Sequence, residues 1–79
     1  MQEVSRVSGI PVDGGELRYW RQKRVRSPRE LAEASDVALS LVYGLENGYC
    51  QRVRPATIHK LADVLEAAPA KLVDTAKLR

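Results

Sequence analysis

The sequence predicts an all-α fold of five helices with no strand, arranged as one domain. Apolar residues recur at helical spacing in short stretches, and Gly, Pro and Asp separate these stretches. A chain of 79 residues has room for one small core, which a single cysteine cannot reinforce with a disulfide. Because such a core supplies only about 3–5 kcal/mol, we expect a homodimer on grounds of stability.

The N-terminal part is expected to form an arm followed by a helix. Residues 1–14 hold a few apolar residues among Ser, Gly and Pro, which predicts a flexible arm or a segment that pairs with a partner chain. The first helix is expected to begin near Glu16, an acid that suits the positive end of a helix dipole. Leu17 and Trp20 give this helix an apolar stripe, and Val25 lies near its end.

Two short helical patterns lie between Ser27 and Gly48, separated by a turn at Asp36. Residues 27–30 are a strong helix start, since they supply a serine cap, a proline for the first turn and a capping-box glutamate. The second helix of this pair, the third of the chain, is expected over about residues 38–47, and Gly48 ends it. This arrangement predicts a helix-turn-helix, a unit that places its second helix in the major groove of DNA.

Two further helices complete the expected fold. The fourth helix begins at Pro55 or Ala56 and carries apolar residues at i, i+3, i+4 and i+7. A short fifth helix begins at residues 68–69, where alanine is followed by proline. The expected domain therefore spans residues 15–74, and residues 75–79 form a C-terminal tail.

Charged residues are arranged in blocks along the chain, which has a formal net charge of +3. Residues 18–29 contain six basic residues and no acid, whereas residues 30–48 contain four acids and no base. Basic residues return at Arg52, Arg54 and Lys60. Two basic clusters on either side of one helix pair favour a polyanionic partner.

Several other classes of protein do not fit the sequence. No apolar run is long enough to cross a membrane, and the N-terminus lacks the features of a signal peptide, so we expect a soluble cytoplasmic protein without membrane contact. Ser, His, Cys and carboxylates occur, but no spacing gathers a nucleophile with a base, so we expect no enzyme. Cys50 and His59 are too few to form a zinc site, and we expect neither a metal nor a cofactor.

An ordered set of short motifs spans most of the chain: Leu17…Trp20-Arg21, Ser27…Glu30-Leu31-Ala32-Glu33, Val37…Val42…Leu45-Glu46-Asn47-Gly48 and Pro55…Leu61-Ala62…Leu65. In its order and spacing this set resembles the Cro/C1-type (XRE-type) helix-turn-helix family over residues 15–74. The resemblance implies a five-helix, lambda-repressor-like DNA-binding domain whose relatives are mostly dimeric repressors or regulators. It also implies an ion pair between Arg21 and Glu46 that braces the recognition helix.

The sequence departs from this family at several positions. Ala38 stands where a serine or threonine usually caps the recognition helix, and Asp36 replaces the usual turn glycine. Arg26 occupies a position that is commonly apolar, so we expect Val25 to take over its packing. Pro28 replaces a side chain that often reaches a phosphate. These departures leave the fold in place and alter the expected contacts with DNA.

The expected DNA contacts fall into two groups. The residues expected to bind phosphates are polar or basic and lie beside the two helices of the motif: Arg26, Ser27, Arg29, Asn47, Tyr49, Arg52 and Arg54. The residues that the resemblance places toward the bases are Leu39, Ser40, Leu41, Tyr43 and Gly44. Because the second group lacks an arginine or glutamine for bidentate base contacts, we expect modest direct readout and a large part for DNA shape.

The expected function is that of a sequence-preferring regulator of transcription, a repressor by resemblance, that binds double-stranded DNA as a homodimer. The alternative is a helix-turn-helix relative that binds a protein partner through exposed Leu39 and Leu41. The dimer contact is expected to use either the region of the fourth and fifth helices, with Leu72 and Val73, or the N-terminal arm, with Val4, Val7 and Ile10.

Overall fold

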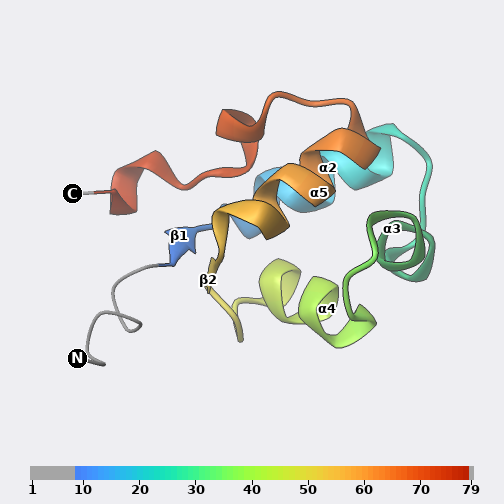
Figure 1. Cartoon of the computed structure of the whole chain (residues 1–79), viewed down its shortest axis with the longest axis horizontal. Coiled ribbons are helices and arrows are strands. Elements are labelled where there is room, and N and C mark those ends of the chain that lie inside the picture. Colours follow the sequence, from blue (N-terminus) through green and yellow to red (C-terminus); the bar gives the residue numbers. More distant parts are fainter. Residues whose placement is uncertain (1–8, 79) are drawn as a thin grey trace.

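The computed structural model describes residues 9–78 (Figure 1). Over these residues the chain forms four α-helices, followed by two short 3-10 helices: α2 (Gly14–Lys23), α3 (Pro28–Ser35), α4 (Leu39–Asn47), α5 (Pro55–Leu65), η1 (Pro69–Leu72) and η2 (Thr75–Lys77). The same residues also include two short strands, β1 (Ile10–Pro11) and β2 (Arg52–Val53), which lie beside the helices. The predicted all-α helix-turn-helix class is confirmed.

Two details of the expected fold are wrong. The fifth helix is a 3-10 helix of four residues, because Pro69 begins it and the chain becomes extended at Val73. The expectation of no strand also fails, since β1 and β2 pair antiparallel with Ile10 opposite Val53. The second error concerns pairing between distant segments, which the local apolar pattern does not encode.

The described part of the expected N-terminal arm belongs to the folded body. Pro11 pairs with Arg52 on one side, and its carbonyl accepts a 2.9 Å hydrogen bond from Asp74 N on the other. Val12 also bridges to Val73, so the chain's first and last described segments lie together (Figure 1). Val4 and Val7 lie outside the described residues.

Side-chain caps define the start of the first two α-helices. Asp13 accepts a 3.1 Å hydrogen bond from Glu16 N, so α2 begins two residues before the expected start. Ser27 and Glu30 form the predicted capping box at α3, with hydrogen bonds of 3.1 and 2.8 Å. Asp36 ends α3 in the left-handed conformation that was expected at this turn.

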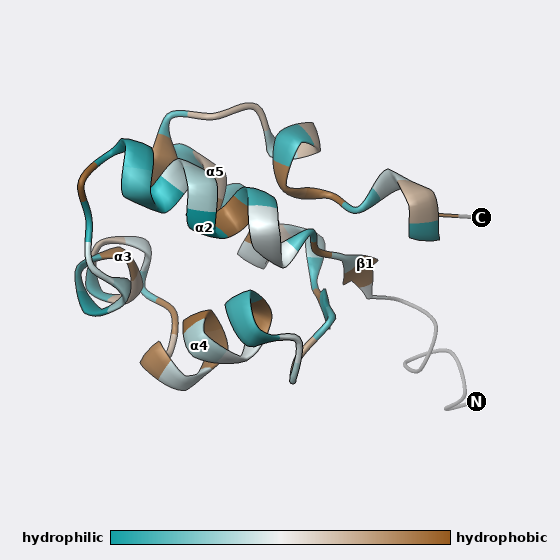
Figure 2. Ribbon diagram, turned by 180° about the vertical axis from the view of Figure 1, so that it is seen from behind, coloured by the Kyte–Doolittle hydropathy of each residue, from teal (hydrophilic) through white to brown (hydrophobic). Residues whose placement is uncertain are grey.

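The core lies where α2, α3, α4 and α5 meet. Its fully buried side chains include Leu17, Leu31, Val42, Leu61 and Leu65, one or two from each helix. Figure 2 shows hydrophobic stretches along α4, the helix that contacts both α2 and α3. Burial of these faces is the main force that fixes the angle of α4 against the rest of the domain. Within residues 9–78, no helix has the length and apolar character needed to cross a bilayer.

Val25 does not take over the packing that Arg26 was expected to lose. The Val25 side chain is 87% exposed, and the residue adopts a left-handed φ of 56°. Arg26 N donates to Arg21 O at 3.1 Å, so Val25 is the reversal residue that follows α2. Its side chain therefore points away from the core, at a position where glycine is usual.

Candidate nucleic-acid interface

One side of α4 is exposed and polar. Ser40, Tyr43 and Asn47 are exposed, and their spacing places them along a single stripe of the helix. Val42 and Leu45 are buried on the opposite side, against the core. The stripe is therefore the surface that α4 can present to a groove of DNA.

The structure contradicts part of the expected base-facing set. Gly44 is buried, and a Cβ added to it would lie 3.1 Å from Cys50 Cβ, so it faces the following loop. Leu39 and Leu41 are half-buried and pack against the core. The reason is that α4 contacts both α2 and α3, which widens its apolar face. Both leucines are therefore only partly exposed, which leaves less apolar surface for the protein-binding alternative that rested on them.

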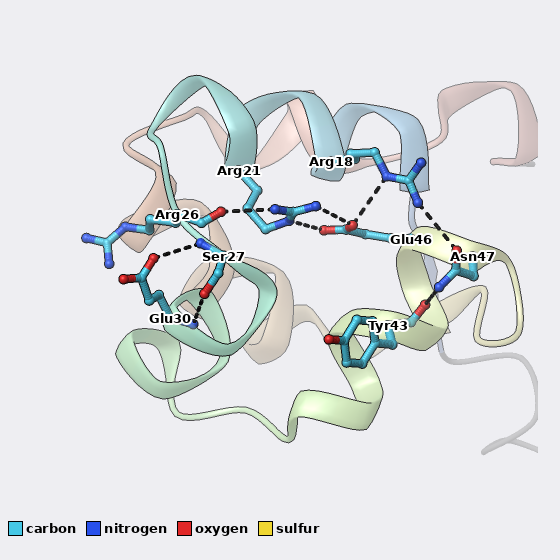
Figure 3. A network of polar contacts seen from close by, with 8 residues as sticks. All are labelled: Arg18, Arg21, Arg26, Ser27, Glu30, Tyr43, Glu46 and Asn47. Carbon is cyan, nitrogen blue, oxygen red and sulfur yellow. Dashed lines mark hydrogen bonds and ion pairs between the residues drawn. The ribbon is translucent and has the colours of Figure 1, made fainter.

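Arg21 and Glu46 join α2 to the end of α4. Arg21 Nε lies 2.6 Å from Glu46 Oε2, and Arg21 Nη2 donates to Glu46 Oε1 at 2.9 Å (Figure 3). Arg21 Nη1 also donates to Arg26 O at 3.0 Å. Hydrogen bonding to Glu46 raises the pKa of the Arg21 guanidinium above its ordinary value. Arg21 therefore braces α4 and the loop before α3, and it is not free to bind a phosphate.

A second arginine reaches the same carboxylate. Arg18 Nε lies 3.4 Å from Glu46 Oε1, and Arg18 Nη2 donates to Asn47 Oδ1 at 3.3 Å (Figure 3). Arg18 was not among the residues expected to contact DNA or Glu46. The signal was present, because Arg18 precedes Arg21 by three residues and so lies on the same face of α2.

Polar and basic groups surround the start of α3. Ser27 Oγ accepts from Glu30 N, so its hydroxyl hydrogen can still be donated to a phosphate. Arg29 is exposed, and Arg26 is half-buried. The Glu30 carboxylate accepts a hydrogen bond from Ser27 N, and its negative charge makes this helix start less favourable for binding an anion. The contact expected here therefore rests on side chains more than on the helix dipole.

The loop after α4 carries the second group of expected phosphate ligands. Tyr49 is 89% exposed, and Arg54 is exposed at the start of α5. Arg52 is exposed on β2, where its Nη1 donates to Gly9 O at 3.0 Å. Asn47 is exposed, and its Nδ2 donates to Tyr43 O at 2.9 Å. The strand pairing thus holds this loop in place beside the end of α4.

The fold and the exposed stripe of α4 define a helix-turn-helix protein. The family described as a helix-turn-helix domain matches residues 14–75. The restriction-modification controller protein C.AhdI from Aeromonas hydrophila is 34% identical, with a TM-score of 0.69, over 73% of this chain and 86% of that chain. The chain belongs to the helix-turn-helix family, of the Cro/C1 (XRE) type that its motifs predicted.

Other solved structures share the fold at lower identity. SinR, a master regulator for biofilm formation solved in complex with DNA, is 24% identical, with a TM-score of 0.73, over 75% of this chain and 97% of that chain. A hydroxyethylphosphonate dioxygenase is 22% identical, with a TM-score of 0.74, over 87% of this chain and 15% of that chain. Comparison with curated protein sequences gave no match. Since the same fold occurs inside an enzyme, the fold alone does not define the function.

Proposed function

We propose that the chain is a regulator of transcription that binds double-stranded DNA, with α4 in the major groove. The observation that carries this proposal is the polar stripe of Ser40, Tyr43 and Asn47 on a helix whose other side is anchored in the core. The Arg21–Glu46 pair supports it, because a braced helix loses little freedom on binding. The match to the family and the likeness to C.AhdI and SinR point the same way.

Affinity in this proposal comes mainly from phosphates, and base readout is modest. Arg29, Arg52 and Arg54 are exposed cations on either side of α4 in the sequence. Ser40 can hydrogen-bond to several bases, and Tyr43, which is 49% exposed, can reach a base or the backbone. Neither side chain distinguishes bases as sharply as a bidentate arginine does. DNA shape then supplies much of the preference.

The proposed regulator acts as a homodimer that represses transcription. Leu72 is fully buried, so it cannot form the dimer contact that was expected of it. Ile10 and Val73 instead line one apolar groove of about 180 Å³ beside α5, together with Ile58. A second copy bound in this groove would contact residues from both expected dimer surfaces, Ile10 of the N-terminal arm and Val73 of the C-terminal region. Two copies would present two α4 helices about 34 Å apart, one turn of DNA.

Repression and the absence of catalysis are parts of the same proposal. A dimer bound across successive grooves blocks other proteins from that stretch of DNA, and the Cro/C1-type resemblance favours this mode of action. Binding alone then accounts for the activity, with no substrate turned over. A reporter gene placed behind a selected site tests the direction of regulation, because repression lowers expression of the reporter and activation raises it.

A binding selection tests the function directly. Wild-type chain is mixed at low salt with a pool of random duplexes, and the retained DNA is sequenced. We expect enrichment of a two-fold symmetric site and a steep loss of binding as salt rises. No retained duplex at low salt would refute the DNA-binding proposal. Light scattering on the free protein tests the dimer, and a Val73→Asp variant is expected to be monomeric.

A further inference from the structure

Arg18 is a cation that the Arg21–Glu46 pair leaves only partly neutralised. The two contacts of Arg21 to Glu46, at 2.6 and 2.9 Å, are shorter than the 3.4 Å contact of Arg18. One carboxylate faces two guanidinium groups, so the cluster keeps a net positive charge. The Glu46 side chain is 3% exposed and that of Arg18 is 48% exposed. The surplus charge therefore lies at the surface, on Arg18.

The Asn47 amide is oriented by two hydrogen bonds. Its Oδ1 accepts from Arg18 at 3.3 Å, and its Nδ2 donates to Tyr43 O at 2.9 Å. The oxygen is therefore engaged, and a second Nδ2–H remains to be donated. Arg18 likewise has more N–H donors than its two contacts use. Figure 3 shows these two side chains meeting at the C-terminal end of α4.

Arg18 and Asn47 lie at a helix C-terminus, where an anion can bind only beside a cation. The C-terminus of a helix carries partial negative charge, which repels an anion unless a positive group lies beside it. Arg18 is that group, and it comes from α2 rather than from α3 or α4. A guanidinium and an amide in direct contact can donate to neighbouring oxygens of one phosphate.

We propose that Arg18 and Asn47 together bind one phosphate of the DNA backbone at the C-terminal end of α4. This inference rests on the proposed function and adds a contact from α2 to it. The contact would fix how far α4 enters the groove, since phosphate contacts set the register of a protein on the duplex. Arg18 thereby becomes a DNA-binding residue, whereas Arg21 remains the structural partner of Glu46.

An Arg18→Met variant tests the proposal, with Lys23→Met as its matched control. Both changes remove one positive charge from α2, but Lys23 lies over the rings of Tyr19 and Trp20, whereas Arg18 contacts the end of α4. The probe is a duplex from the binding selection, titrated at several salt concentrations. For Arg18→Met we expect binding about 3- to 10-fold weaker and a salt slope smaller by about 0.9, the effect of one phosphate contact. For Lys23→Met we expect a much smaller change in both.

Equal losses for the two variants, or an unchanged salt slope for Arg18→Met, would overturn the proposal. The thermal midpoint of each variant separates a lost contact from a loosened α4, which would lower the midpoint and leave the slope unchanged. An Asn47→Ala change supplies an independent test. The double variant, Arg18→Met with Asn47→Ala, is expected to lose less DNA affinity than the product of the two single fold-losses, because both side chains bind the same phosphate. Independent losses would contradict the shared contact.

The two proposals fail in different ways. If wild-type chain retains no duplex at low salt, the proposed function is refuted. If wild type binds with a steep salt dependence and Arg18→Met binds equally well, the phosphate contact alone is refuted.

Discussion

Arg24 Nε donates a 2.6 Å hydrogen bond to the carbonyl oxygen of Leu65, at the last residue of α5. Arg24 Nη2 donates to Glu66 O at 3.2 Å as well, and the guanidinium lies 5.5 Å from the centre of the Trp20 ring. Arg24, the C-cap residue of α2, thus donates to carbonyls that the end of α5 leaves without helical partners. It joins two helices that lie far apart in the sequence.

An Arg24→Met variant is expected to lose about 1–2 kcal/mol of unfolding free energy, because charged hydrogen bonds to helix-end carbonyls are lost. Urea unfolding followed by circular dichroism measures this loss. Arg24 is not part of the proposed interface, so the DNA affinity of the folded variant should stay at the wild-type value. A fall in the salt slope would show instead that Arg24 contacts DNA.

An Arg21→Met variant is expected to lose about 2–4 kcal/mol, because it leaves the buried Glu46 carboxylate with Arg18 alone. The raised pKa of Arg21 means that its contribution is present below its ordinary pKa and is lost only as pH rises through the raised value. The stability difference between wild type and Arg21→Met should therefore be constant between about pH 7 and 10. Urea titrations at several pH values check this, and a difference that shrinks within that window would contradict it.

A Val25→Gly variant is expected to be more stable than wild type by about 0.5–1 kcal/mol. Valine is sterically strained in the left-handed conformation, and glycine relieves this strain. The relief outweighs the larger entropy that glycine gives to the unfolded chain. Packing is not lost, because the side chain is 87% exposed. The control is Val25→Ala, which keeps the backbone cost and should leave the thermal midpoint nearly unchanged.

Two neighbouring glycines are expected to respond in opposite directions to alanine. A Cβ at Gly14 would collide with the carbonyl oxygen of Leu45, so Gly14→Ala should push α2 away from α4 and cost about 1–3 kcal/mol. At Gly15 the nearest atom is Asp13 Oδ1 at 3.4 Å, so Gly15→Ala should stabilise the helix by about 0.5–1 kcal/mol. Thermal unfolding of both variants gives the comparison. Similar effects at both positions would show that helix propensity alone decides.

An Ala38→Ser variant is expected to gain about 1 kcal/mol, because serine supplies the side-chain cap that alanine cannot give to α4. The backbone of Ala38 already has the extended conformation of a cap residue, with φ of −68° and ψ of 142°. The unfolding free energy measures the gain. Ala38→Val is the control, since valine adds bulk without an acceptor and should bring no gain.

Local chemistry made much of the helix-turn-helix predictable. The capping box of Ser27 and Glu30, the left-handed Asp36 and the terminal Gly48 each depend on neighbours within a few residues. The ordered motifs were specific enough to indicate the family. The structure also brings Arg21 and Glu46 together, as the resemblance implied.

Features that depend on distant contacts were not predictable in the same way. The pairing of Ile10 with Val53 joins segments that share no local pattern. The partial burial of Leu39 and Leu41 depends on how closely α4 approaches both α2 and α3. Periodicity shows which residues share a face of a helix, but it does not show how wide that face is once two neighbours cover it.

The strand that contains Ile10 lies between the two regions that are proposed to bind DNA and a second copy of the chain. It pairs with the segment of Arg52, which carries the loop proposed to bind phosphates, and Val12, which follows the strand, bridges to Val73, which lines the proposed dimer groove. Association of two copies and binding of DNA would then act on the same three-segment unit. If DNA binding orders this unit, the association of two copies would cost less entropy, and the reverse would also hold. DNA binding and dimerisation would then strengthen each other by the same factor.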